Sequence, residues 1–335
     1  MIARLIHGWE RRLASVTTDR VVRPFEWGLE WVDLATDDGS GASDALRVWA
    51  EQATRESDRF YHVGPAAEYA FDGHRLSFES ALRTPHPENN IVRARFFRAR
   101  DDRARRAVVV LPQWNADPQG HVGLCELFAR FGISALRLSL PYHDERMPPE
   151  LHRADYIVSA NVGRTAQVCR QAVLDARRAV QWLHAEGYER IGIIGTSLGS
   201  CLSMLTAAHE PLIRAAAFNH VSPWFADVVW DGLSTEHVRQ GLDGQITLDQ
   251  LRDIWLPISP FPYMDKVRGR KLLVVYARYD LTFPLELSKR FIEEFRARGI
   301  DHERFVLPCG HYSTGKAPFS WMDGFALTRF FRRNL

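Results

Sequence analysis

The sequence predicts an α/β protein with a mostly parallel central sheet and helices on both faces. From about residue 107 onward, short apolar runs alternate with longer segments of helical periodicity, and such alternation is typical of β-α-β crossovers. The strand-like runs are apolar at nearly every position, which indicates strands covered on both faces. The composition, with 46% hydrophobic and 25% charged residues, is that of an ordinary globular protein.

The first 73 residues differ from the rest and are predicted to form a mostly helical extension. Residues 44–53 carry apolar side chains at helical spacing. Two strand-like runs follow at 76–82 and 91–99, separated by a turn rich in Pro and Asn at 84–90. We therefore expect one main domain over residues 74–335.

Strands and helices then alternate to the end of the chain. Strands are expected where the sequence is short, apolar and bounded by turn residues, and helices where apolar residues recur every three or four positions. The expected strands are 107–111, 134–140, 190–194, 213–218, 271–276 and 303–307, and the expected helices are 121–131, 165–183, 198–209, 287–298 and 321–332.

One segment, about 222–266, interrupts the alternation and is predicted to be an inserted helical lid. It is predicted to contain two helices, with Thr247 and Gln250 forming a capping box for the second. The aromatic side chains of the insert either line a pocket above the sheet or seal the insert onto the body; both interpretations remain open. These side chains are Trp224, Phe225, Trp230, Trp255, Phe261 and Tyr263.

The motif Gly195-Thr-Ser197-Leu-Gly199 lies between an expected strand and an expected helix. This is the context of a nucleophile elbow, in which a serine occupies a strained turn above the edge of a sheet. The positions two before and two after the serine approach each other closely, so glycine is required there for steric reasons. The following helix also presents its N-terminus to developing negative charge.

An acid and a histidine follow the serine in the order that this arrangement requires. Asp280 comes just beyond the strand at 271–276, and His311 follows the last strand, after Gly310, which would let the loop bend. Alone, Asp280 would be interpreted as a turn or capping residue and His311 as a surface histidine. Their order and their places at strand ends favour a Ser-Asp-His triad instead.

From about residue 74 to its end, the chain resembles the α/β-hydrolase superfamily, and it looks like bacterial serine esterases of that superfamily with a helical N-terminal extension. The resemblance rests on the Gly195–Gly199 motif, Asp280 and Gly310-His311. It implies an α/β-hydrolase fold with Ser197 as nucleophile and His311 as general base and then acid. Asp280 would orient the imidazole and stabilise its charged form.

An oxyanion hole formed by backbone N–H groups is also implied. One donor should be Leu198, directly after the nucleophile. The second should come from the loop after strand 107–111, where Trp114 is the first choice and Gln113 the second. Pro112 is excluded because it has no N–H. Many relatives carry His-Gly where this chain has Pro112-Gln113, so the identity of the second donor is left open.

Four further residues are candidate substrate contacts. His143, Asp144 and His220 follow the C-terminal ends of expected strands, where ligands collect in open α/β sheets. Trp224 opens the insert. For His143 and Asp144, a structural role supporting the loop at 112–115 is the favoured alternative.

Charge, cysteine usage and the absence of certain motifs limit the functions that are compatible with the sequence. With 43 Lys and Arg against 41 Asp and Glu, the net charge of +2 provides no field for nucleic acid. The four cysteines show no paired spacing and the N-terminus has no signal-peptide core, so a cytoplasmic protein is expected. The uncharged run 191–208 is interpreted as a strand entering a helix, not as a membrane span. No metal-ligand spacing or cofactor fingerprint is present.

The predicted function is hydrolysis of a small-molecule carboxylic ester without a cofactor or metal. The triad would also serve a peptidase, an amidase or an acyltransferase of the same fold. A non-catalytic binding protein on a hydrolase scaffold is disfavoured because no triad member is missing. The sequence leaves the substrate, the role of the extension and the oligomeric state open.

Overall fold

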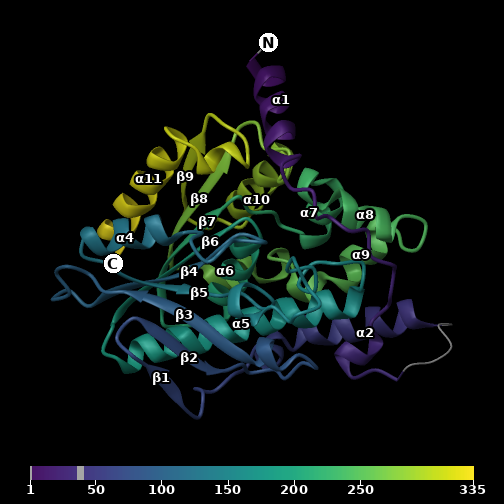
Figure 1. Ribbon diagram of the computed structural model, residues 1–335, viewed down its shortest axis with the longest axis horizontal. Coiled ribbons are helices and arrows are strands. Elements are labelled where there is room, and N and C mark those ends of the chain that lie inside the picture. The colour runs from purple at the N-terminus through teal and green to yellow at the C-terminus, as the bar shows by residue number, and fades with distance from the viewer. Residues whose placement is uncertain (1, 36–40) are drawn as a thin grey trace.

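The computed structural model describes residues 2–35 and 41–335, and its centre is one nine-stranded sheet (Figure 1). The strand order is β1-β2-β3-β5-β4-β6-β7-β8-β9. Strands β4 to β9 run parallel, and β1 to β3 form an antiparallel edge that joins the rest through β5. The strands are β1 Tyr69–Phe71, β2 Arg75–Glu79, β3 Ile91–Phe97, β4 Arg106–Leu111, β5 Ser134–Leu138, β6 Arg190–Thr196, β7 Ile213–Asn219, β8 Lys271–Ala277 and β9 Glu303–Leu307.

Helices cover both faces of the sheet, as the alternation predicts. Helices α4 (Val122–Arg130) and α11 (Phe319–Asn334) contribute to the apolar core on one face. Helices α5 (Val162–Ala185), α6 (Leu198–His209) and α10 (Leu285–Ala297) contribute to the core on the other. The uncharged run at 191–208 is divided between β6 and α6. Within the described ranges, no helix is both long and apolar enough to cross a membrane.

The segment before residue 74 is mostly helical but also supplies an edge strand. It contains α1 (Ile2–Ala14), the 3₁₀ turn η1 (Leu29–Val32), α2 (Ala42–Arg55) and α3 (Ser57–Phe60); residue 1 and residues 36–40 of the predicted extension lie outside the described residues. Strand β1 pairs with β2, so the sheet begins before the proposed domain boundary. In Figure 1, α1 stands out from the body at the top of the view.

The inserted segment forms three short α-helices instead of the two that the sequence predicts. They are α7 (Phe225–Asp231), α8 (Glu236–Leu242) and α9 (Leu248–Ile254), and the predicted capping box of α9 is present. Trp255 is fully buried and donates a hydrogen bond to Val162 O (3.0 Å), which seals the insert onto α5. Other 3₁₀ turns are η2 Pro87–Asn90, η3 Asp144–Arg146, η4 Leu233–Thr235, η5 Leu256–Ile258, η6 Phe261–Val267 and η7 Ser313–Gly315.

A buried ion pair fixes helix α5 to the loops at the antiparallel edge. Arg146 and Asp175 have no exposed side-chain surface, and Arg146 Nη2 lies 2.9 Å from Asp175 Oδ2. The guanidinium also donates to the carbonyl oxygens of Asn89 and Ser139. Because both charges are paired and hydrogen-bonded, the pair holds the turn after β5 in a defined position. That turn carries His143.

We predict that Asp175→Ala lowers the free energy of unfolding by about 3–5 kcal/mol, because it leaves the Arg146 guanidinium buried without its counter-charge. Urea unfolding followed by circular dichroism measures the change. The variant Asp249→Ala removes an acid that is 89% exposed and pairs with Arg252, and it should cost about 1 kcal/mol or less. Equal effects of the two substitutions would contradict the prediction.

Candidate active site

Ser197 occupies a strained turn between β6 and α6, as the motif predicts. Its φ is 57° and its ψ is −121°, a combination that non-glycine residues rarely adopt. A Cβ at Gly195 would fall onto the carbonyl group of Gly199, and a Cβ at Gly199 would fall onto the Leu111 carbonyl oxygen. The steric interpretation of the two glycines is therefore confirmed, and Gly199 additionally brings the elbow against the end of β4.

The loops after β8 and β9 bring Asp280 and His311 to the same sheet edge as Ser197. His311 Nε2 lies 3.1 Å from Ser197 Oγ, and His311 Nδ1 lies 2.9 Å from Asp280 Oδ2. The Phe283 ring lies parallel to the imidazole, with 5.6 Å between the ring centroids. Three residues from three strand ends thus form a continuous hydrogen-bonded chain that ends at a hydroxyl group.

Asp280 is held as a buried carboxylate. Its Oδ1 accepts hydrogen bonds from the backbone N–H groups of Thr282 (2.8 Å) and Phe283 (2.7 Å). Burial alone would raise the pKa of Asp280, but the charge of His311, its hydrogen bond and the adjacent His220 ring outweigh burial and hold that pKa well below its usual range. The carboxylate therefore stays ionised throughout the neutral and mildly acidic range.

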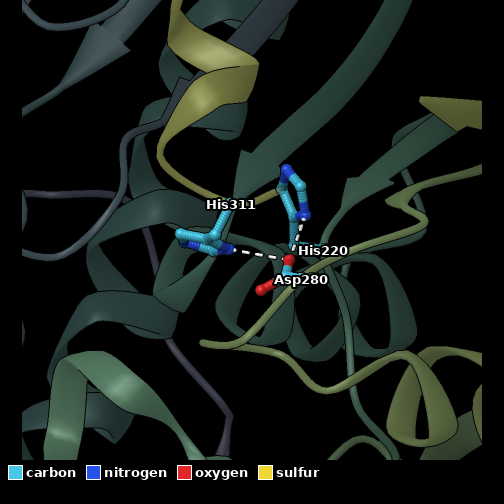
Figure 2. Close-up of side chains that lie close together, drawn as sticks. All are labelled: His220, Asp280 and His311. Carbon is cyan, nitrogen blue, oxygen red and sulfur yellow. Dashed lines mark hydrogen bonds and ion pairs between the residues drawn. The ribbon is translucent and has the colours of Figure 1, made fainter. Parts of the chain in front are cut away.

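His220 is a second imidazole on the same carboxylate. Figure 2 shows that it approaches Asp280 from another side than His311. His220 Nδ1 lies 2.8 Å from Asp280 Oδ2 but off the direction that a good hydrogen bond requires, and its ring centroid is 4.6 Å from that of His311. Burial, followed by the nearby charge of His311, lowers the pKa of His220. His220 therefore lies beside both Asp280 and His311, and it also lines the cavity.

The cluster of His220, Asp280 and His311 has the donor set of a metal site, with ligand atoms within 4.8 Å of one another. However, His311 Nδ1 and Asp280 Oδ2 are already bonded to each other, and His311 Nε2 faces Ser197. Two of the three groups are thus committed to the hydrogen-bonded chain that ends at Ser197, so we assign the cluster no metal.

A cavity of about 860 Å³ opens above Ser197 and His311. Its walls come from distant parts of the chain, including the segment after α1, the loop after β4, the insert and helix α11. Phe225, Val228 and Val229 of α7 make one wall apolar, so the insert contributes to the cavity as well as sealing the body. Representative lining residues are Thr17, Arg20, Trp114, Phe225, Phe283 and Trp321.

The backbone N–H groups expected in an oxyanion hole lie along this cavity. Leu198 is the first residue of α6, so no carbonyl group within the helix accepts a hydrogen bond from its N–H. Gln113 and Trp114 also line the cavity, and within residues 2–35 and 41–335 no loop carbonyl or side chain accepts from either N–H. The Asn115 N–H, in contrast, donates to His143 Nε2 (2.9 Å). The geometry keeps both Trp114 and Gln113 as candidates for the second donor.

His143 and Asp144 do not line the cavity; they support the loop after β4. His143 is 1% exposed, and its Nδ1 donates to Pro141 O (2.9 Å) while its Nε2 accepts from Asn115 N–H. Burial lowers the pKa of His143 to about 4, so the ring is neutral. Asp144 binds Arg137 (2.8 Å) and accepts from Ser139 Oγ (2.9 Å). The geometry thus favours the structural alternative for both residues.

Trp224 also lies outside the cavity wall. Its ring stacks on Phe261 at a centroid distance of 4.5 Å, so it packs within the insert. The indole of Trp114 does reach the cavity, where it stacks on His237 (5.7 Å between centroids) and donates its Nε1–H to Ala154 O (2.9 Å). Trp224 is therefore a packing residue of the insert, and helix α7 supplies the apolar wall of the cavity.

Several cavity residues have no recognisable signal in the sequence. Thr17 and Arg20 reach it from the segment after α1, and Arg20 donates to the hydroxyl of Tyr312 (3.0 Å). Asp323 of α11 accepts from Asn219 Nδ2 (2.8 Å), and burial raises its pKa to about 7. No local motif marks these positions, because each enters the site through packing between segments remote in sequence.

We predict that His143→Gln reduces the loss of stability at acidic pH. Between about pH 6.5 and about pH 4, the unfolded chain binds a proton at this imidazole and the folded chain does not, so His143 costs about 1.4 kcal/mol of stability per pH unit as the pH falls. Glutamine does not titrate, so the variant's unfolding free energy should fall less steeply between about pH 7 and pH 5. Urea unfolding at several pH values measures both slopes, and identical slopes would overturn the prediction.

No protein-family model matches the sequence, and no curated protein matches it. Solved structures do match. An acylaminoacyl peptidase from Pyrococcus horikoshii superimposes with a TM-score of 0.61 at 16% identity over 78% of this chain and 41% of its own. The chain therefore spans less than half of that protein.

Two esterases match over most of their own length. Esterase Pf2001 from Pyrococcus furiosus has a TM-score of 0.56 at 16% identity, over 79% of this chain and 91% of its own. Acetyl xylan esterase 1 from Thermoanaerobacterium sp. JW/SL YS485 has a TM-score of 0.60 at 14% identity, over 96% of this chain and 98% of its own. At these identities the likeness shows the fold, which is the α/β-hydrolase fold that the sequence predicts.

Proposed function

We propose that this protein is a serine hydrolase that cleaves a carboxylic ester through an acyl-enzyme on Ser197. The observation that carries the proposal is the hydrogen-bonded chain from Asp280 through His311 to Ser197 Oγ, which opens into the cavity. Hydrogen-bond reach between a nucleophile, its base and an orienting acid is the arrangement that activates a hydroxyl.

In the proposed reaction, Ser197 Oγ attacks the ester carbonyl carbon as His311 Nε2 takes the hydroxyl proton. Asp280 holds the Nδ1–H of His311 and stabilises the imidazolium. The N–H of Leu198 and that of Trp114 or Gln113 would stabilise the oxyanion. His311 then gives its proton to the departing alcohol. A water molecule, deprotonated by the same imidazole, attacks the acyl-enzyme, and collapse of the second tetrahedral intermediate returns the proton to Ser197 and releases the acid.

The cysteines support serine as the nucleophile. All four are free and buried, and Cys201 lies one turn after Ser197. Burial raises the pKa of Cys201 to about 11 and that of Cys125 to about 12, so neither is a thiolate at neutral pH. Cytoplasmic localisation remains a proposal, supported by these unpaired thiols.

An ester is favoured over an amide as the substrate by the extent of the structural likeness. The acetyl xylan esterase matches nearly the whole of both chains, whereas the acylaminoacyl peptidase is matched over less than half of its length. The apolar wall of α7 favours an acyl or aryl group of moderate size. Parallel assays of p-nitrophenyl esters and the corresponding anilides test this choice, and faster cleavage of the anilides would favour the peptidase. Product analysis with added alcohols would reveal an acyltransferase.

We predict that Ser197→Ala abolishes ester hydrolysis, with kcat lowered by at least about 10³-fold, because the hydroxyl nucleophile is lost. A fluorophosphonate probe should label the wild type at Ser197 and leave the variant unlabelled. Circular dichroism and the melting temperature serve as the folding control. Full activity in the folded variant, or labelling at another residue, would refute the proposal.

We predict that Asp280→Asn lowers kcat by about 10³–10⁴-fold while the probe site remains Ser197. The amide cannot stabilise the imidazolium and offers an N–H where His311 Nδ1 needs an acceptor. Steady-state kinetics on p-nitrophenyl acetate measures the loss. Asp102→Asn is the control, because this carboxylate is 16% exposed, pairs with Arg105 (2.7 Å) and precedes β4, at the opposite end of the strands from Ser197. A comparable loss in the control would contradict a special role for Asp280.

A further inference from the structure

Glu10 is the only acid of α1 and is buried although the helix around it is mostly exposed. Of the described residues of α1, Glu10 and Ala14 alone are buried, and Glu10 has no exposed surface. Ile2 and Leu5 of the same helix are 65% and 70% exposed. A carboxylate is costly to bury unless hydrogen bonds compensate it, so the contact that Glu10 makes is specific.

The partners of Glu10 are the groups that directly follow His311. Glu10 Oε2 accepts from Tyr312 N–H (2.8 Å), and Glu10 Oε1 accepts from Ser313 N–H (2.9 Å) and Ser313 Oγ (2.6 Å). Ser313 Oγ in turn accepts from Gly310 N–H (2.9 Å). The carboxylate thus ties together the residues on both sides of His311 from an element 302 positions away.

Gly310 is shaped to receive this carboxylate. A Cβ at Gly310 would collide with the side-chain carbons of Glu10. The sequence attributes the glycine to a bend in the loop, but its φ is not in the left-handed region. The close approach of Glu10 is what requires a residue without a side chain there.

Two further contacts connect α1 and the segment after it to the loops that carry Asp280 and His311. Arg20 donates to the Tyr312 hydroxyl and to Ala14 O, which links Tyr312 to the end of α1. His7 packs edge-on against Tyr279, the residue before Asp280, with 6.2 Å between centroids. Tyr279 N–H donates to Cys309 O (2.9 Å), which joins the loop of Asp280 to that of His311.

We propose that Glu10 is a positioning residue for the reaction: it fixes the backbone of the His311 loop so that Nε2 stays within hydrogen-bond reach of Ser197. Glu10 does not line the cavity, so it acts through the loop and not on the substrate. This inference rests on the proposed function. Displacing a reacting group by about 1 Å costs on the order of 10²-fold in rate, so a loosened loop should lower kcat and leave KM nearly unchanged.

The test is Glu10→Gln in the full-length protein, with the number of active sites determined by fluorophosphonate titration. The amide nitrogen brings a donor against the donors at Tyr312 and Ser313. We expect kcat per titrated site on p-nitrophenyl acetate, and the rate of probe labelling at Ser197, to fall by about 10- to 100-fold. KM should stay within about twofold.

Glu210→Gln is the matched control for a purely structural effect. Glu210 is also a buried glutamate (2% exposed) that accepts a backbone N–H, from Leu212, and pairs with Arg177. The Glu210→Gln variant should have a lower melting temperature but the same kcat per titrated site as the wild type. If Glu10→Gln behaves in the same way, the positioning role is overturned.

Ser313→Ala keeps the test informative if Glu10→Gln does not fold. Removing this hydroxyl breaks the link from Gly310 to Glu10, so kcat per titrated site should again fall with little change in KM, and unchanged kcat would overturn the proposal. Where both variants fold, the double variant should lose less than the product of the two single losses, because both act on one loop. Labelling of the wild type at Ser197 checks the proposed function separately, so failure of one claim is distinguishable from failure of the other.

Discussion

The close approach of two backbones at the turn that carries Ser197 is the constraint on which the site depends. Gly195 and Gly199 bring the end of β6, the start of α6 and the end of β4 into contact, and no side chain fits between them. This packing maintains the strained backbone of Ser197, a conformation that persists only where the surroundings over-determine it. The same contact sets the Leu198 N–H beside the loop that carries Gln113 and Trp114. Ser197 and the candidate oxyanion donors therefore lie at the same tightly packed junction.

Around that junction, hydrogen bonds join several of the buried polar groups. Asp280 accepts from two backbone N–H groups and faces two imidazoles. His143 is neutral; it accepts from the Asn115 N–H of the loop after β4 and donates to Pro141 O of the turn after β5, so it joins the two loops. In a medium of low polarity, each such group is costly when unpaired and rigid when paired. Rigidity at this edge of the sheet is the property that a preorganised site requires.

Features that arise from neighbouring residues in the sequence could be predicted, whereas features that arise from packing between remote segments could not. The elbow glycines, the strand runs and the capping box of α9 leave short-range patterns, and the sequence predicts them correctly. The order and strand context of Asp280 and His311 also suffice to predict them as neighbours of Ser197. Strand β1 is three residues long and half-buried, so it has no alternation to detect. The insert has three short helices because turns at 232–235 and 243–247 divide it, and periodicity over seven residues is weak.

The contact between Glu10 and the loop after β9 has a consequence for how the enzyme is made. Synthesis proceeds from the N-terminus, so Glu10 is made before the loop that it holds, which lies 302 positions later. Contacts of such separation close the largest loops and form late in folding. The His311 loop can reach this geometry only once both α1 and the segment after β9 are present. The geometry of the His311 loop therefore depends on docking between two segments that are remote in sequence, and not on local folding alone.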